Sequence, residues 1–168
     1  MRLFNWELAF ATYRDGYSHH NFFDKCNEHE YSILVIKDRV GFVFGAFCAE
    51  EWIDQTNFYG NGDAFVFTFR DGDDLEIFPA TGMDTWYQSA DEDGIIIGGS
   101  SKTKSRAALS ISNRFKQGHS GHSSTFDNEV LCGQQSAGKE MSLSQKLFQN
   151  NGDFQIDLFE VWGFDMAY

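Results

Sequence analysis

The chain is short of basic residues and has no long apolar run. Its 168 residues include 13 Lys and Arg against 25 Asp and Glu, which gives a formal net charge of −12 at pH 7. Because such a charge repels phosphate groups, we expect the protein to bind neither nucleic acid nor anionic membrane surfaces. No apolar stretch approaches the roughly 20 residues that cross a bilayer, so we expect no membrane insertion.

Cysteine is also scarce in this sequence. Cys26, Cys48 and Cys132 form no CxxC unit and no paired framework, and each lies among apolar residues. This usage favours free thiols in a reducing compartment. The N-terminal stretch carries Asn5 and Glu7 among its apolar residues, and no small-residue cleavage site follows, unlike a signal peptide. We therefore predict a cytoplasmic protein.

A single proline, Pro79, and the lack of internal repeats leave nothing in the sequence that marks a linker between domains. The length and the 42% hydrophobic content suit one sizeable core better than two. We predict one domain over residues 1–168. The 18 phenylalanines and four tryptophans favour packed sheets filled by large flat side chains over a helical bundle.

The run ILVIKDRVGFVFGAFCAEEW, residues 33–52, predicts two apolar strands joined by a tight polar turn. Both faces of its first strand are apolar, so we expect a central strand that is covered on both sides. Lys37, Asp38 and Arg39 carry the charge of the turn, and Gly41 supplies backbone freedom near its end.

Other patterns predict a fold that is mainly β. A short helix is expected over residues 19–27, with Ser18 as its N-cap and with Phe22 and Cys26 on one face. The short connections between the remaining strands favour two antiparallel sheets packed as a β-sandwich. The predicted class is therefore α+β, mainly β, with a few short flanking helices.

Alternation assigns faces to two further strands. Along residues 64–70, Phe65, Phe67 and Phe69 share one face, which we predict to face the core. Along residues 154–162, Glu160 falls on the same face as its apolar neighbours, so a carboxylate is predicted to point toward the core. Those neighbours are Phe154, Ile156, Leu158 and Trp162.

A buried carboxylate at Glu160 must be neutral or paired. Lys37, Arg70 and Arg106, on neighbouring strands, are the candidate partners. We interpret Glu160 as half of a structural ion pair, with a general acid as the alternative, because perturbed carboxylates also occur in purely structural networks.

Five blocks in a fixed order, from residue 12 to residue 164, resemble the TLDc domain of the oxidation-resistance proteins and their relatives. They are TYRDGYS, the run of residues 33–52, FYGNGDAFVF, TFDNEVL and EVWGF. Where members of that family have a longer glycine run, this chain has Gly98-Gly99-Ser100-Ser101. The positions that match the family pattern, taken mainly as structural signatures, are Gly45, Glu51, Trp52, Gly60, Gly62, Gly98, Glu160 and Trp162.

The resemblance implies a cytosolic β-sandwich protein that protects against oxidative stress and binds the peripheral sector of the vacuolar proton-pumping ATPase. No reaction is established for that family. We therefore expect a non-catalytic protein-interaction module, monomeric in isolation, without a metal or cofactor. The acidic composition favours a partner with a basic surface patch. A structural component of a larger cytoskeletal or ciliary assembly is the alternative.

An enzyme is the other alternative, and its candidate site is GHSGHSSTFD, residues 118–127. His119, Ser120, His122 and Asp127 are the residue types of a nucleophile, a base and an orienting acid for a hydrolase. The GxSxG pattern of a nucleophile elbow is missing, and serine-rich turns commonly bond to their own backbone. We expect a polar loop.

The same histidines, with Asp127 or Cys132, have residue types that bind zinc, but no HExxH helix or second cysteine pair accompanies them. A peroxide-consuming enzyme would instead need a reactive thiolate. None of the three cysteines has two basic neighbours, and Cys48 is closely followed by Glu50 and Glu51, which discourages a thiolate.

Overall fold

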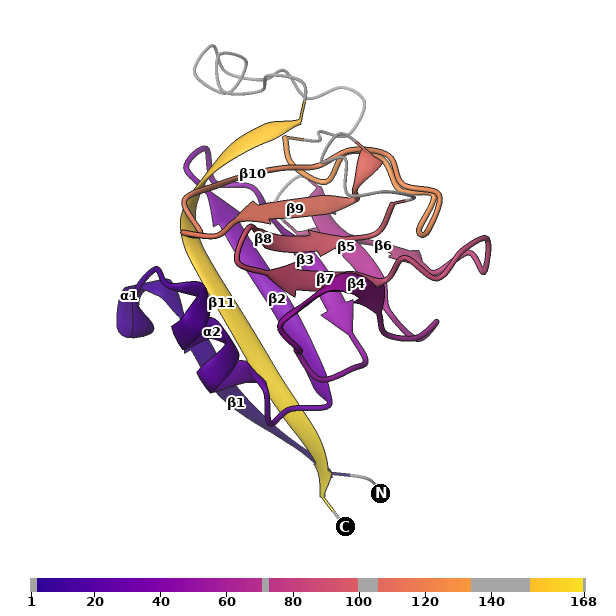
Figure 1. Ribbon diagram of the computed structural model, residues 1–168. Coiled ribbons are helices and arrows are strands. Elements are labelled where there is room, and N and C mark those ends of the chain that lie inside the picture. The colour runs from indigo at the N-terminus through magenta and orange to yellow at the C-terminus, as the bar shows by residue number, and fades with distance from the viewer. Residues whose placement is uncertain (1–2, 71–72, 100–105, 134–151, 168) are drawn as a thin grey trace.

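The computed structural model describes residues 3–70, 73–99, 106–133 and 152–167, so Ser100 and Ser101 lie outside the described part (Figure 1). Within these ranges, neither helix is long and apolar enough to cross a membrane. The elements in chain order are β1 (Leu3–Ala11), α1 (Thr12–Asp15), α2 (His19–Cys26), β2 (Tyr31–Asp38), β3 (Val43–Cys48), β4 (Gln55–Tyr59), β5 (Phe65–Arg70), β6 (Asp74–Pro79), β7 (Gln88–Asp91), β8 (Gly94–Ile97), β9 (Leu109–Ser112), β10 (Gln117–His119) and β11 (Asp153–Ala167).

The strands form one large antiparallel sheet in the order β4-β7-β8-β9-β10-β11-β2-β3-β5-β6, with β1 also paired to β11. The long strand β11 joins the parts of this sheet, because it pairs with β10 near its start and with β2 and β1 further along. The mainly β class is confirmed. The expected division into two separate sheets is not what these hydrogen bonds show, since β10 and β11 connect the whole path.

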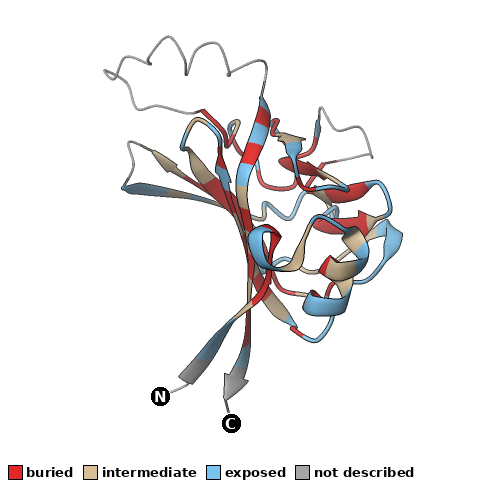
Figure 2. Cartoon of the chain, turned by 90° about the vertical axis from the view of Figure 1, so that its left-hand side faces the viewer, coloured by how far each residue is buried: buried red, intermediate tan, exposed pale blue. Residues whose placement is uncertain are grey.

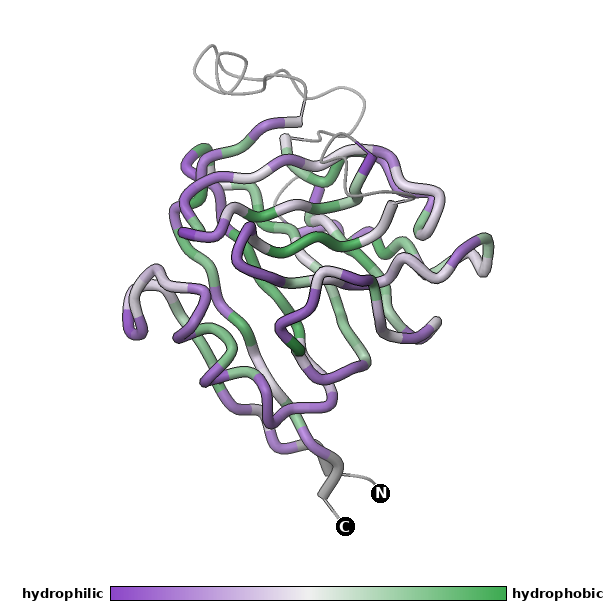
Figure 3. The backbone as a smooth tube through the Cα atoms, in the orientation of Figure 1, coloured by the Kyte–Doolittle hydropathy of each residue, from purple (hydrophilic) through white to green (hydrophobic). Residues whose placement is uncertain are grey.

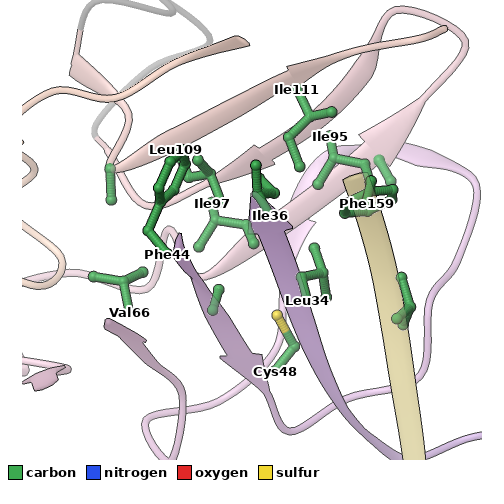
Figure 4. Packing of buried hydrophobic residues seen from close by; sticks show 14 of the residues in the cluster. Leu34, Ile36, Phe44, Cys48, Val66, Ile95, Ile97, Leu109, Ile111 and Phe159 are labelled. Carbon is green, nitrogen blue, oxygen red and sulfur yellow. The ribbon is translucent and has the colours of Figure 1, made fainter. Parts of the chain in front are cut away.

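The core is a single cluster to which strands on both sides of β11 in the sheet contribute. Leu34 and Ile36 of β2 and Phe44 of β3 belong to the same cluster as Ile97 of β8 and Leu109 of β9 (Figure 4). Apolar residues concentrate along these strands, and hydrophilic residues dominate many of the connections (Figure 3).

The predicted hairpin and helix are both confirmed. Strands β2 and β3 pair antiparallel from Ser32 to Lys37 of β2. Their turn closes on Asp38, whose Oδ1 accepts hydrogen bonds of 2.8–3.0 Å from three backbone N–H groups of residues 40–42. The hydroxyl of Ser18 accepts from the backbone N–H of Asn21 and caps α2. Helix α2 buries Phe22 and Cys26, as its spacing predicts.

The prediction that Glu160 faces the core is wrong, because β11 contains an irregularity. Its pairing register with β2 shifts between Ile156 and Leu158. Before the shift, Ile156 is buried, whereas after it Phe159 is buried and Glu160 is only half-buried. A bulge places the later even-numbered residues on the opposite face of the sheet.

The predicted core face of β5 is also wrong. Val66 and Thr68 are its fully buried residues, at 0% and 1% exposure, whereas Phe65 and Phe69 are half-buried on the opposite face. Thr68 satisfies its hydroxyl inside the core by donating to the backbone oxygen of Leu131 at 2.6 Å. The strand therefore buries a polar residue against the core, while its phenylalanines lie on the other face, where Phe67 is 7% exposed.

Strand β2 is central, but it is not covered on both sides as its sequence suggests. Leu34 and Ile36 are fully buried, whereas Ile33 and Val35 are half-buried. Figure 2 shows both helices on one side of the sheet, and among the described residues no element covers the other side. We call this second side, formed by β1, β11, β2, β3, β5 and β6, the outer face.

Candidate functional site

Ser120, the candidate nucleophile, is held by the backbone. It is fully buried, and its hydroxyl donates to the backbone oxygen of Ala108 at 2.7 Å while accepting from the backbone N–H of Leu131 at 2.8 Å. Both contacts fix the loop that follows β10. Both partners lie outside residues 118–127, so these are not the local bonds that the sequence predicts for a serine-rich turn; Ser123 makes one such bond, accepting from the backbone N–H of Phe126 at 3.2 Å.

The two candidate histidines bind different carboxylates. His119 Nδ1 lies 2.7 Å from Oδ1 of Asp153 on β11, and His122 Nε2 lies 2.8 Å from Oδ1 of Asp127. In the described part of the chain, no hydrogen bond joins Ser120 to either imidazole. The four candidate residues are close in sequence but bond to different partners. They therefore do not form a connected nucleophile, base and acid. The described residues contain no group of three or more His, Cys, Asp or Glu that could hold a metal ion.

His119 borders a shallow polar cavity of about 230 Å³ on the strands β9, β10 and β11. An imidazole bonded to a carboxylate can exchange a proton with water or a ligand in such a cavity. The hydroxyl of Ser120 is not part of its lining. The polar residues that line it are Ser110, Ser112, Gln117, His119, Asp153 and Gln155.

Asp84, which no motif in the sequence marks, anchors the loop from the other side. Its carboxylate accepts hydrogen bonds from the hydroxyls of Ser124 and Thr125, the latter at 2.6 Å. The Thr125 hydroxyl in turn accepts from the backbone N–H of Gly99 at 2.9 Å. Burial opposes ionisation of Asp84, but these bonds and the backbone N–H of Trp86 outweigh it and hold the pKa below its ordinary value.

The signature glycine Gly98 makes room for an aromatic ring. Its φ is +77°, and a Cβ at this position would lie 3.0 Å from the Phe126 ring and 3.1 Å from the Ser123 hydroxyl. Gly60 has a φ of +108° and a similarly close approach, 3.1 Å, to Tyr87. Gly62 has more room, since a Cβ there would lie 3.5 Å from the Tyr87 hydroxyl. These glycines serve the packing of the chain.

Trp52 and Gly45 also have structural roles. Trp52 is buried, its indole Nε1 donates to the Ser32 hydroxyl at 2.9 Å, and its ring lies 5.3 Å from that of Phe22. A Cβ on Gly45 would collide with the backbone of β2 and lie 3.0 Å from the Phe67 ring. Glu51, next to Trp52, is exposed, so packing does not account for this signature residue.

Glu160 has a partner other than the predicted cations. Its Oε2 accepts a 3.0 Å hydrogen bond from the indole of Trp162, which follows it on the same face of β11. Arg70 instead pairs with Glu76 and, at 2.7 Å, with Glu129. Lys37 and Arg106 are exposed. The two signature residues thus form a local pair on the outer face.

The three cysteines are free and buried, as their apolar surroundings predict. Burial raises the pKa of Cys26 and Cys48 far above that of a free thiol. Burial also raises the pKa of Cys132 to about 12. Because the thiolate is the reactive form, none of the three is activated toward peroxide in this conformation.

Comparison with known proteins finds a matching family model and related proteins. A family model described as the TLDc domain matches residues 1–165. The chain is 29% identical over 161 residues to oxidation resistance protein 1 of Rattus norvegicus and 27% identical over 161 residues to nuclear receptor coactivator 7 of Gallus gallus. Each alignment covers 95% of this chain but only 17% and 15% of those relatives.

Proposed function

The chain belongs to the TLDc domain family, and we propose that it acts as a non-catalytic protein-interaction module in protection against oxidative stress. The relatives named oxidation resistance protein 1 and nuclear receptor coactivator 7 support this role, since their names denote a stress function and a coactivator. We further propose that the module acts in the cytoplasm and binds the peripheral sector of the vacuolar proton-pumping ATPase.

The observation that supports this proposal is that the signature residues pack the scaffold. Gly45, Gly60, Gly98 and Trp52 fit the backbone and rings of the scaffold, and the candidate nucleophile Ser120 is bonded to the backbone on both sides. Residues shared with the family therefore build a frame. Recognition of a protein partner then depends on exposed groups on the surface of this scaffold.

Glu51 is the exposed residue to test first, because it matches the family pattern and packing does not explain it. The chain carries a net charge of −12, so we expect its partner surface to be basic. A carboxylate at the exit from β3 can then contribute to steering and to contact with that partner.

Purified peripheral-sector subunits of the ATPase, passed over the immobilised chain, test the proposal. We expect capture that weakens in high salt, because exposed charge contacts are screened within about 8 Å at physiological ionic strength. Glu51→Lys should weaken capture about tenfold or more, and Glu28→Lys, which makes the same charge change at another exposed position, should have a small effect.

No capture of any subunit by the wild-type chain would overturn the ATPase proposal. Equal weakening by the two Glu→Lys changes would instead contradict a specific role for Glu51. Recovery of cytoskeletal or ciliary components in place of ATPase subunits would support the alternative of a structural component in a larger assembly.

A further inference from the structure

The outer face carries a continuous row of aromatic rings across five strands. Trp6 of β1 lies 4.5 Å from Phe164 of β11, measured between ring centroids, and Phe164 lies 5.9 Å from Phe47 of β3. Phe47 stacks at 5.0 Å on Phe65 of β5. Tyr31 of β2 fills the row between β11 and β3, and Phe67 and Phe69 continue it along β5.

The two edges of this face expose large apolar side chains. Trp6 is 53% exposed on β1, and Leu75 and Ile77 are 52% and 48% exposed on β6. Ile77 pairs with Phe67 and Leu75 with Phe69, so these side chains extend the same surface. Between the edges, Phe164 and Phe67 are buried at 8% and 7% exposure, so the exposed apolar area is concentrated at the two edges. Exposed apolar groups of this kind mark interaction sites in soluble proteins.

Strand β6 departs from the usual pattern of an edge strand. Its apolar residues Leu75 and Ile77 point outward, and the acidic Asp74 and Glu76 lie on the other side, where Glu76 pairs with Arg70. A strand with one solvated face normally places polar residues outward. Neither Leu75 nor Ile77 belongs to the core cluster, so the core does not account for them.

The charge of the chain indicates which kind of partner can bind the outer face. By pairing register, Lys37 of β2 and Glu160 of β11 lie on this face with opposite charges, and Asp157 is exposed at the bulge of β11. Most of the charges behind the net charge of −12 therefore lie off this face. A second copy of the chain would bring another −12 and repel the first, whereas a partner with an apolar centre and basic flanks is attracted.

The width of the face matches a helix. Six strands spaced about 4.8 Å apart span about 24 Å, and at 1.5 Å per residue a helix of about 16 residues crosses that distance. We propose that the outer face is the docking surface for an amphipathic helix of a protein partner, apolar on one side and rich in Lys and Arg on its flanks. This inference rests on the proposed role as an interaction module, but not on the ATPase as the partner.

A labelled 16-residue helical peptide of leucine and lysine, with leucine on one face, is the probe. Its affinity is measured by fluorescence anisotropy against the full chain. Leu75→Gln/Ile77→Gln should weaken binding about tenfold, because the change removes apolar area at the rim of the face without adding charge. Ile53→Gln is the matched control, since Ile53 is 45% exposed outside the six strands, and we expect less than a twofold change.

The inference is overturned if the peptide does not bind, or if Ile53→Gln weakens it as much as the paired change on β6. Equal affinity for a leucine and glutamate peptide of the same pattern would overturn the basic character of the partner. A wild-type dimer in sedimentation, made monomeric by Leu75→Gln/Ile77→Gln, would identify a second copy as the occupant and overturn the helix.

Capture of ATPase subunits by the same variants separates this inference from the proposed function. Capture by the wild-type chain without peptide binding overturns the docking surface alone. Peptide binding that depends on Leu75 and Ile77, without capture of any ATPase subunit, overturns the ATPase proposal and supports the docking surface. Circular dichroism of each variant confirms that the fold is retained.

Discussion

The indole of Trp52 donates a 2.9 Å hydrogen bond to the hydroxyl of Ser32, and both side chains are buried. The bond ties the segment that leaves β3 to the start of β2, twenty residues earlier in the sequence. It explains why a tryptophan closes the hairpin. The ring fills the core beside Phe22, and its one polar atom has a partner inside the protein.

Removing the acceptor of this bond should destabilise the fold. We expect Ser32→Ala to lower the free energy of unfolding by about 1–3 kcal/mol, because it leaves the buried indole N–H unsatisfied. Urea unfolding measures the change. A double-mutant cycle with Trp52→Phe is the control, since Ser32→Ala should cost less once the indole N–H is gone. Strictly additive effects would contradict the bond.

Gly98 and Gly82 form a matched pair that separates backbone strain from crowding. Their φ angles are +77° and +79°, but a Cβ on Gly98 would press on Phe126, whereas one on Gly82 would meet nothing within 4 Å. Gly82→Ala should cost about 1–2 kcal/mol for the backbone alone. Gly98→Ala should cost a further 1–3 kcal/mol or so for overpacking. If the two changes lowered the free energy of unfolding equally in urea, the Phe126 ring would move aside without loss of stability.

Asp84 should contribute stability that depends on pH. Because its folded pKa lies below the ordinary value of 3.8, the contribution is complete at neutral pH and is lost as the pH falls through 3.8 and then through the folded pKa. Asp84→Asn should therefore lower the free energy of unfolding at pH 7 by about 1–2 kcal/mol. The difference from wild type should shrink below about pH 4.

Urea unfolding between pH 7 and pH 3 follows this difference. Asp157→Asn on β11 is the control, because Asp157 is exposed and its change should leave the pH profile close to that of wild type. A difference for Asp84→Asn that stays constant over the whole range would show that the carboxylate charge does not matter.

The cysteines should be protected in the native state. Their raised thiol pKa values and their burial predict that Ellman's reagent at pH 8 reacts no faster than the protein unfolds. In urea all three should react quickly. If one thiol of the native protein reacted at the rate of free cysteine, the peroxide-consuming alternative would regain support.

The local elements of this fold could be predicted from the sequence. The hairpin of β2 and β3, the helix α2 and the cap at Ser18 all follow from spacing over a few residues. The local bond of Ser123 to the backbone N–H of Phe126 also follows from composition, whereas the bonds of Ser120 to Ala108 and Leu131 span more than ten residues and do not. Asp84 could not be found this way, because its partners lie about forty residues away.

The faces of the strands could not be predicted by alternation alone. The bulge between Ile156 and Leu158 reverses which residues of β11 are buried, and no residue type in that stretch marks it. On β5, three phenylalanines alternate as a core face would, yet the core takes Val66 and Thr68. Hydrophobicity identifies a face that avoids water, and it cannot tell whether the chain itself or a partner covers that face.

The position of β11 also sets the order in which a newly made chain can fold. This strand lies between β10 and β2 in the sheet, although it comes last in chain order among the described strands. A ribosome therefore adds more than half of these 168 residues between β2 and β11, and β11 is the strand that pairs with one edge of β2. During that interval β2 has an unpaired edge, and nascent chains with such edges are prone to aggregate. The domain can close only when its C-terminal residues leave the ribosome.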